Sequence, residues 1–225
     1  PRSTQGVSSA ASDVYKRQDL TLHGGLSATA GTLSSTGGTL GLPGGATLAT
    51  GASFSTTNTT LNLGGSLAVA DTWTITSTSV SLTDNASLNH SNTNPLSLVS
   101  LQTNGYDFEL ASATSDLTIE NAFALSGSET LSTHGADLIF ESSADISSGS
   151  TLDVSGTDNS SGGKLEFQQG GTASGTINAR NATFKIGSAF SVTGTLKTNS
   201  STTWELGTSN PVSYTHLRAH ETDSY

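Results

Sequence analysis

The amino-acid sequence predicts an all-β fold, a parallel β-solenoid (β-helix) of about ten coils, with roughly 20 residues and three short strands in each coil. Three observations support this prediction: apolar pairs recur at a period near 20, short alternating segments follow each pair, and glycine doublets separate the segments. Alternation over a few residues is a strand pattern, and frequent glycine makes helices costly. We therefore expect no helix in residues 19–210.

The first strand of each coil is marked by an apolar residue, any residue and a second apolar residue. Successive pairs begin 20, 21, 19, 16, 21, 21, 27, 19 and 20 residues apart. The 27-residue step contains "SGTDNSSGG" (Ser155–Gly163), whose composition is typical of a loop. The pairs are Leu20/Leu22, Leu40/Leu42, Leu61/Leu63, Val80/Leu82, Leu96/Leu98, Leu117/Ile119, Leu138/Phe140, Leu165/Phe167, Phe184/Ile186 and Trp204/Leu206.

Two further short strands follow each first strand, after about six and about twelve to fourteen residues. One such coil cannot bury its apolar side chains alone, but stacked coils can bury them as ladders of like residues. At about 4.8 Å per coil, ten coils make a rod of roughly 45 Å. The second strands include Leu26, Ala46/Leu48, Leu67/Val69, Ala86/Leu88, Phe123/Leu125, Ala144/Ile146 and Phe190/Val192, and the third include Leu33, Phe54, Trp73/Ile75, Leu131, Leu152/Val154, Ile177 and Leu196.

Glycine doublets predict the corners, because a tight corner needs a backbone conformation that glycine adopts easily. "HGG" (His23–Gly25), "PGG" (Pro43–Gly45), "LGG" (Leu63–Gly65) and "QGG" (Gln169–Gly171) each follow a first strand and are predicted to share one phase. The register is least defined between Ser91 and Leu110, where several apolar pairs compete and Pro95 is expected at a corner. A β-sandwich is the alternative fold, but its turns would be about 8 to 12 residues apart, and here they come about every six or seven.

Both ends of the chain have a different character. Back-translation of "SSAASDVYKRQ" (Ser8–Gln18) resembles a tagmentation adapter used in DNA sequencing, and "VSYTHLRAHET" (Val212–Thr222) resembles the opposite adapter. We therefore interpret residues 1–18 and 211–225 as adapter-derived and unstructured, and exclude them from the fold. Residues 19–210 are interpreted as a β-solenoid fragment of a longer gene in a metagenomic sample.

The charge of residues 19–210 limits the possible partners. Fifteen Asp and Glu residues stand against four cations, so the net charge is −11, and the cations are Lys164, Arg180, Lys185 and Lys197. An acidic surface repels phosphate backbones, so no nucleic-acid partner is expected, and no apolar run is long enough to insert into a membrane. The absence of cysteine excludes disulfides and thiolate sites.

The repeat style also resembles a known class of proteins. "GTL", "ATL", "STLDVSG" and "GTINARNATFKI" are similar to phrases in the right-handed β-helical passenger and stalk regions of bacterial autotransporters and filamentous-haemagglutinin-type adhesins. The resemblance implies a secreted protein at the bacterial cell surface, associated with the outer membrane. It further implies a non-catalytic stalk or adhesin segment, with any host-surface or carbohydrate ligand outside residues 19–210.

No catalytic, cofactor-binding or metal-binding residue is predicted. Asp137, Asp153 and Glu166 fall at different offsets in their coils and Asp145 flanks a second strand, so these carboxylates are interpreted as solvated charges without a cationic partner on a shared face. Acidic turn segments such as "TDNASL" (Thr83–Leu88) offer oxygen ligands for calcium, but Asp and Asn are also common turn residues. The three histidines, His23, His90 and His134, are expected at the surface or at corners.

Two alternatives from other classes remain. A β-helical polysaccharide-processing enzyme, or a carbohydrate binder like a phage tail spike, requires a groove lined by carboxylates, cations and aromatic residues. A lectin-like module requires exposed aromatic side chains in a row. Because Trp73 and Trp204 take inward positions in the repeat, we expect both to be buried, and Tyr106 is expected at a corner, where it is a candidate ligand contact.

Overall fold

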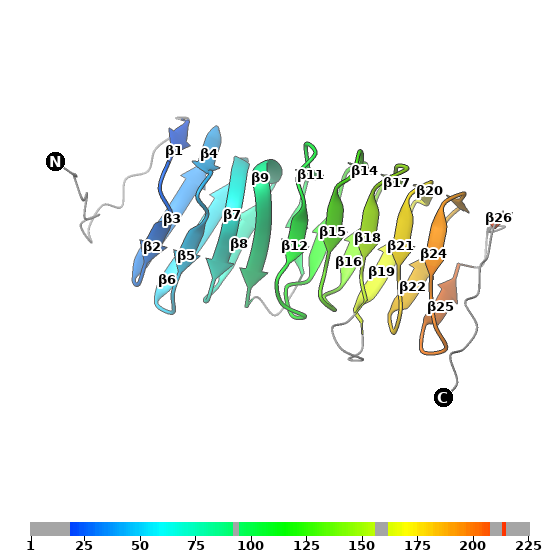
Figure 1. Ribbon diagram of the computed structural model, residues 1–225. Coiled ribbons are helices and arrows are strands. Elements are labelled where there is room, and N and C mark those ends of the chain that lie inside the picture. The colour runs from blue at the N-terminus through cyan, green and yellow to red at the C-terminus, as the bar shows by residue number, and fades with distance from the viewer. Residues whose placement is uncertain (1–18, 92–94, 156–161, 208–212, 215–225) are drawn as a thin grey trace.

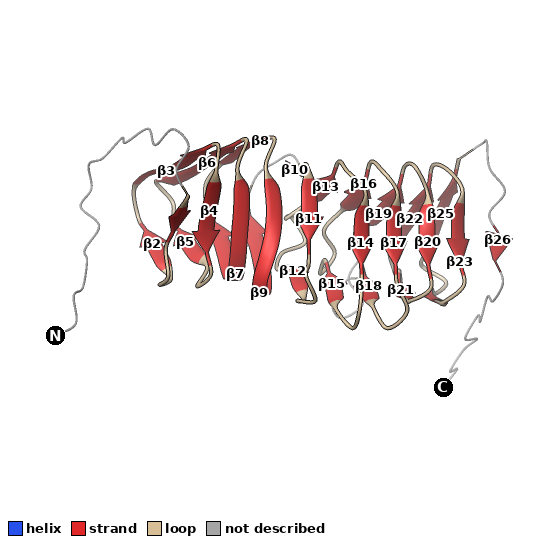
Figure 2. Ribbon diagram, turned by 90° about the horizontal axis from the view of Figure 1, so that it is seen from above, coloured by secondary structure: helices blue, strands red, loops and turns tan. Residues whose placement is uncertain are grey.

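The structure is a rod of stacked β-coils (Figure 1). This computed structural model describes residues 19–91, 95–155, 162–207 and 213–214. All strand pairs between coils are parallel, and the described residues contain strands, turns and no helix. Figure 2 shows the coils side by side along the rod. The predicted all-β parallel solenoid is confirmed.

Each coil passes through three faces of the rod, and neighbouring strands of one face pair in register except at one step of the first face and one step of the third, where the sheet is interrupted. The first face contains β1 (Leu20–Thr21), β4 (Thr39–Leu42), the first part of β7 (Thr60–Val69), the first part of β9 (Ser79–His90), β11 (Ser100–Gln102), β14 (Phe123–Leu125), β17 (Ala144–Ile146), β20 (Gly171–Ala173), β23 (Phe190–Val192) and β26 (Ser213–Tyr214).

The second face continues from the first after one corner. It contains β2 (Leu26–Ala28), β5 (Ala46–Leu48), the later parts of β7 and β9, β12 (Phe108–Leu110), β15 (Thr130–Ser132), β18 (Thr151–Asp153), β21 (Thr176–Asn178) and β24 (Thr195–Lys197). The third face contains β3 (Gly31–Thr36), β6 (Ala52–Thr57), β8 (Trp73–Thr76), β10 (Leu96–Leu98), β13 (Leu117–Ile119), β16 (Leu138–Phe140), β19 (Lys164–Phe167), β22 (Thr183–Ile186) and β25 (Thr203–Leu206).

Two coils depart from three short strands. β7 and β9 each run through the corner between the first and second faces as one long strand. Their pairing contains an irregularity between Leu63 and Gly65, where Gly65 has a φ of 70°. The corner is therefore a bulge within a continuous ladder and not a break between strands.

The number of coils is smaller than predicted. The longest ladder runs through nine strands, from β1 to β24, and therefore through eight stacking steps, or about 38 Å of rod. The prediction of ten treated Leu96/Leu98 as the start of a new coil, 16 residues after Val80. In the structure Leu101 pairs with Val80, whereas Leu96 pairs with Leu117 on the third face. One change of face was thus counted as a coil.

This change of face also explains the corners. The apolar pairs up to Val80/Leu82 lie on the first face, and the pairs from Leu96/Leu98 onward lie on the third. "QGG" (Gln169–Gly171) accordingly leads from β19 into the first residue of β20, where the third face meets the first, while "LGG" (Leu63–Gly65) lies within β7, at the corner between the first and second faces. The predicted common phase of the glycine doublets is therefore wrong.

The core is a continuous column of inward side chains from Leu40 to Leu196. Its C-terminal half contains an aromatic stack, in which the ring of Phe167 lies 5.2 Å from that of Phe140 and 4.3 Å from that of Phe190. In the N-terminal half, Trp73 stacks on Phe54 at 4.9 Å. Stacked coils place like residues in contact, which is why the ladders read so clearly in the sequence.

The two tryptophans differ from one another. Trp73 is 1% exposed, as predicted, and its Nε1 donates a hydrogen bond to Thr56 Oγ1 at 3.1 Å. Trp204 is 36% exposed, so the prediction of burial was wrong for it. Its ring contacts Phe184 edge-on at 5.2 Å, but β25 is the last third-face strand among the described residues, and no later described coil packs over the ring.

Several predictions fall on segments that the structure does not describe. Residues 1–18 lie outside the described residues, as do 156–161, which form most of the predicted loop Ser155–Gly163. Within 211–225, only Ser213–Tyr214 is described, as β26 paired with β23. Among the described residues, no helix is long and apolar enough to cross a membrane.

Candidate functional site

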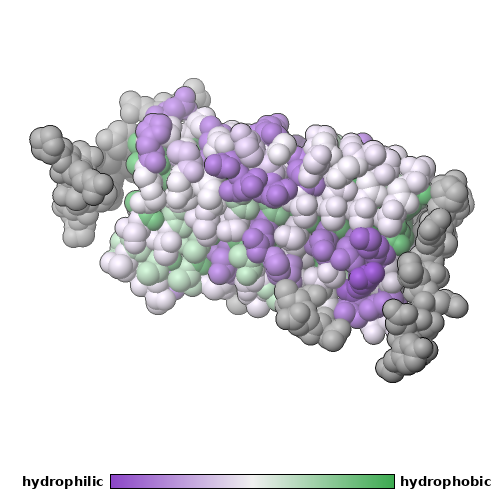
Figure 3. All heavy atoms as spheres, viewed as in Figure 1, coloured by the Kyte–Doolittle hydropathy of each residue, from purple (hydrophilic) through white to green (hydrophobic). Residues whose placement is uncertain are grey.

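The second face carries two rows of outward polar side chains, because inward and outward positions alternate along each strand. Register keeps each row aligned from β7 to β24. One row contains Asp107, Thr130, Thr151, Thr176 and Thr195, and the other contains Ser66, Ser87, Glu109, Ser132, Asp153, Asn178 and Lys197. In Figure 3, which views the rod as in Figure 1, hydrophilic groups gather over its middle and near its C-terminal end.

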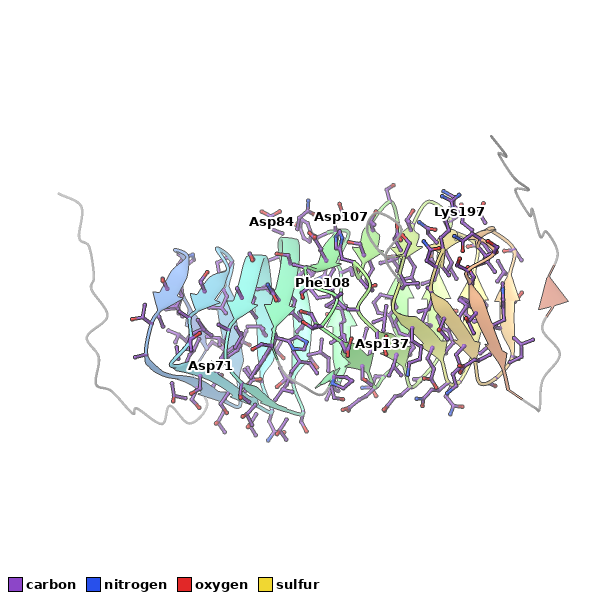
Figure 4. All side chains as sticks on the ribbon, turned by 90° about the horizontal axis from the view of Figure 1, so that it is seen from below. Asp71, Asp84, Asp107, Phe108, Asp137 and Lys197 are labelled. Atoms are coloured by element: carbon purple, nitrogen blue, oxygen red, sulfur yellow. The ribbon has the colours of Figure 1, made fainter. Side chains whose placement is uncertain are left out.

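An open hollow of about 560 Å³ lies on this face, where the long strands β7 and β9 give way to the short strands β12 and β15. Its polar lining includes Ser66, Asn85, Ser87, Asp107, Glu109 and Thr130. Figure 4 places Asp107 beside Asp84 on one edge of the rod, with Lys197 along the same edge toward the C-terminus and Asp71 away from it. We call this feature the central hollow.

Hydrogen bonds between coils hold the carboxylate of Asp107 in place. The backbone N–H of Asp107 donates to Asn85 Oδ1 at 2.9 Å, and the backbone N–H of Thr130 donates to Asp107 Oδ1 at 2.6 Å. Each side-chain oxygen therefore accepts a backbone N–H of the next coil. The Asp107 carboxylate is fixed at the edge of the central hollow by this chain of bonds, which leaves its Oδ2 as an acceptor.

Glu109 contributes a second carboxylate two residues further along the chain, on β12. Its Oε1 lies 2.7 Å from Nε2 of His134, which sits at the corner after β15 with a φ of 48°. Phe108, between the two acids, points into the core and is 1% exposed. The central hollow thus offers carboxylate, amide and hydroxyl groups, and no Lys or Arg belongs to its lining.

The carboxylates that were interpreted as solvated charges also link neighbouring coils. Asp137 Oδ1 accepts the backbone N–H of Lys164 at 2.7 Å, and Asp145 Oδ1 accepts that of Thr172 at 3.1 Å. Asp153 Oδ2 accepts from Asn178 Nδ2 at 3.0 Å. Since neighbouring coils are about 4.8 Å apart, an outward Asp easily reaches the next backbone. These residues stabilise the stacking, a role that composition does not reveal.

Glu166 has the cationic partners that sequence reasoning missed. Its carboxylate lies 3.0 Å from Lys185 Nζ and 3.2 Å from Lys164 Nζ, and the residue is only 7% exposed. Burial raises the pKa of Glu166, but the hydrogen bonds and charges of the two lysines outweigh burial and hold this pKa below its ordinary value. The hydrogen bond to Glu166 in turn raises the pKa of Lys185.

A signal for this cluster was present in the apolar pairs. The central residues of Leu165/Phe167, Phe184/Ile186 and Trp204/Leu206 are Glu166, Lys185 and Glu205, and they pair in register on β19, β22 and β25. Aligning the pairs one above another would have placed opposite charges on adjacent strands. The cluster lies on the third face, whereas the central hollow lies on the second.

The histidines fall into three environments. His23 is exposed and His134 lies at a corner, as predicted, but His90 is 1% exposed, so its expected surface position was wrong. Its backbone N–H donates to Ser115 Oγ, and its Nε2 lies 3.1 Å from the carbonyl oxygen of Asp116. Burial lowers the pKa of His90 below 6.5, against the opposing effect of Asp116. His90 ends the long strand β9 and pairs in register with the buried Val69. The apolar pattern of the sequence did not indicate that position 90 faces inward.

The other candidate ligand contacts predicted from the sequence were the "TDNASL" segment and Tyr106. Asp84 and Asn85 of the "TDNASL" segment lie on β9, where Asp84 Oδ1 accepts the N–H of Asn85. Tyr106 lies at the corner between β11 and β12 and packs partly against the core.

No group of three or more His, Cys, Asp or Glu side chains in the described ranges is placed to hold a metal ion. No protein-family model, curated protein or solved structure matches the chain.

Proposed function

We propose that residues 19–210 form a non-catalytic structural stalk in a large secreted bacterial surface protein, where they hold adhesive or other parts of that protein at a distance. The single observation that carries this proposal is the uninterrupted core, which connects the coils from Leu40 to Leu196. A rod whose every coil packs on the next behaves as a stiff spacer, because bending it would open contacts between coils.

The bacterial origin, the export and the outer-membrane-associated location are part of the same proposal. The resemblance of phrases such as "STLDVSG" to passenger and stalk regions of autotransporters and filamentous-haemagglutinin-type adhesins supports them. The acidic, sparsely charged surface fits an extracellular rod that must stay soluble at high exposed area. A host-surface or carbohydrate ligand would then bind parts of the protein beyond this rod.

A spacer tolerates the loss of one whole coil, and this tolerance gives the test. Gly171 pairs with Phe190, so deletion of residues 171–189 removes one coil and places β23 directly on β17. We expect the protein to keep its β-sheet circular dichroism spectrum and its cooperative unfolding. Small-angle X-ray scattering should show a rod shorter by about 5 Å.

The matched control is deletion of residues 171–180, about half a coil, which brings the strands after it onto the wrong faces. We expect this variant to lose cooperative unfolding. If removal of the full coil disrupts the fold as much as removal of half a coil, the coils are not interchangeable spacers and the proposal fails.

A further inference from the structure

The charges of the rod are unevenly distributed along its axis. Residues 19–163 contain thirteen Asp and Glu residues and neither Lys nor Arg, while the four cations of residues 19–210 all lie between Lys164 and Lys197. Acidic groups without intervening cations add their fields, and a concave surface concentrates the resulting negative potential. The central hollow, between β7 and β15, lies within this acidic stretch.

We propose that the central hollow binds a cationic side chain, a lysine or arginine carried on an extended segment of a partner protein. The carboxylates of Asp107, just before β12, and of Glu109, on β12, flank the site, and Ser and Thr hydroxyls surround them. Asp107 uses Oδ1 for the backbone of Thr130, and Glu109 uses Oε1 for His134. The second oxygen of each acid and the hydroxyls supply acceptors, which an ammonium group with three N–H donors or a guanidinium with five can satisfy.

Three features of the hollow favour this ligand over others. The charge is complementary, because the lining contributes two carboxylates and no Lys or Arg. Phe108 turns its ring into the core, so it gives a sugar ring no aromatic surface on which to stack. Beyond Thr130, which lines the hollow, the row continues through Thr151 and Thr176 along the second face and offers hydroxyls to the flanking peptide backbone.

The experiment measures binding of tetralysine to the full chain by isothermal titration calorimetry at neutral pH and about 0.15 M salt, where long-range attraction is screened. The hollow variant is Asp107→Asn/Glu109→Gln. Asn at 107 keeps the amide oxygen that Thr130 needs, as Asn85 does for Asp107 in the preceding coil. The control is Asp145→Asn/Glu141→Gln, which removes the same charge outside the lining of the hollow.

We expect the hollow variant to bind tetralysine about tenfold or more weakly, and the control to bind within about twofold of the original chain. Thermal melts of both variants check that the fold is intact. Equal weakening in the two variants would show attraction to the rod as a whole and overturn the proposal. Binding of calcium chloride or a neutral cello-oligosaccharide in place of tetralysine would overturn it as well. The coil-deletion test of the stalk acts on residues 171–189, so the two proposals can fail independently.

Discussion

Lys185 Nζ lies 3.0 Å from the carboxylate of Glu166, and the two residues belong to neighbouring coils, on β22 and β19. Lys164, which lies on the same strand as Glu166, contacts the same carboxylate. One nearly buried acid is thus neutralised by two partly exposed lysines. Opposite charges on outward side chains of the solenoid therefore come together only when the coils stack.

Replacement of this acid tests the energetic role of the cluster. Glu166→Gln keeps the shape and one acceptor but leaves two lysines without their counter-charge. We expect a loss of about 1 kcal/mol in unfolding free energy, or about 2–4 °C in Tm, since both lysines are exposed to solvent screening. Thermal melts at neutral pH measure it. Glu141→Gln, at an exposed position after β16, is the control and should leave the Tm nearly unchanged.

The buried histidine predicts an acid-sensitive step. Because the pKa of His90 is lower in the folded chain than its ordinary value of 6.5, the unfolded chain binds the proton more tightly. Stability is therefore full above pH 6.5 and falls as the pH drops through the folded pKa. Tm measured between pH 7.5 and 5 should decline, and His90→Gln should flatten the upper part of this decline. An unchanged slope in His90→Gln would show that other groups cause it.

The lowered pKa of Glu166 acts in a more acidic range. Its contribution is present above the ordinary value of 4.5 and is lost as the pH falls through the lower folded value. Below pH 4.5 the Tm of the original chain should approach that of Glu166→Gln. A difference that stays constant from pH 7 to pH 3 would contradict the assigned ionisation.

The aromatic stack predicts a large core effect. Phe167 contacts the rings of Phe140 and Phe190, and it is fully buried. Phe167→Ala should cost about 3–5 kcal/mol, through lost burial and the cavity that remains. Denaturant unfolding measures the change. Trp204→Ala, which removes a larger ring that is 36% exposed, should cost clearly less.

Substitutions at two glycines test separately the cost of a steric clash and the cost of backbone strain. Gly170 and Gly105 have similar φ values, 81° and 89°. A Cβ on Gly170 would lie 1.8 Å from the carbonyl oxygen of Ala189, whereas a Cβ on Gly105 meets nothing within 4 Å. Gly105→Ala should cost about 1 kcal/mol from the left-handed backbone alone. Gly170→Ala should cost at least about twice as much, by the same denaturant measurement.

The sequence predicted the fold class well because stacking requires apolar residues at the same inward positions in every coil. Inward positions such as Leu61 and Val80 face like residues above and below, so their pattern repeats in the chain. The register near Leu96 and Leu101 could not be predicted, because both are apolar and both face inward, Leu96 on the third face and Leu101 on the first. Only the pairing of Leu101 with Val80 shows that Leu101, and not Leu96, continues the first face.

The polar features were harder to predict. The central hollow depends on how β12 follows the long strands β7 and β9, and no local pattern encodes that relationship. The contact of Glu109 with His134 joins residues that are adjacent only after two coils have formed. Trp204 shows the opposite limit, since its inward position is clear in the sequence while its burial depends on a neighbouring coil.

The link through Asp137 has a consequence for how such rods lengthen. Asp137 donates its N–H to Asp116 Oδ1 and accepts the N–H of Lys164, so one residue carries both halves of a connection. A gene segment copied in tandem at coil length would bring each new turn a ready donor and acceptor. Lengthening by duplication therefore requires no new interface to evolve, and the length of the rod is set by the number of coils that are copied.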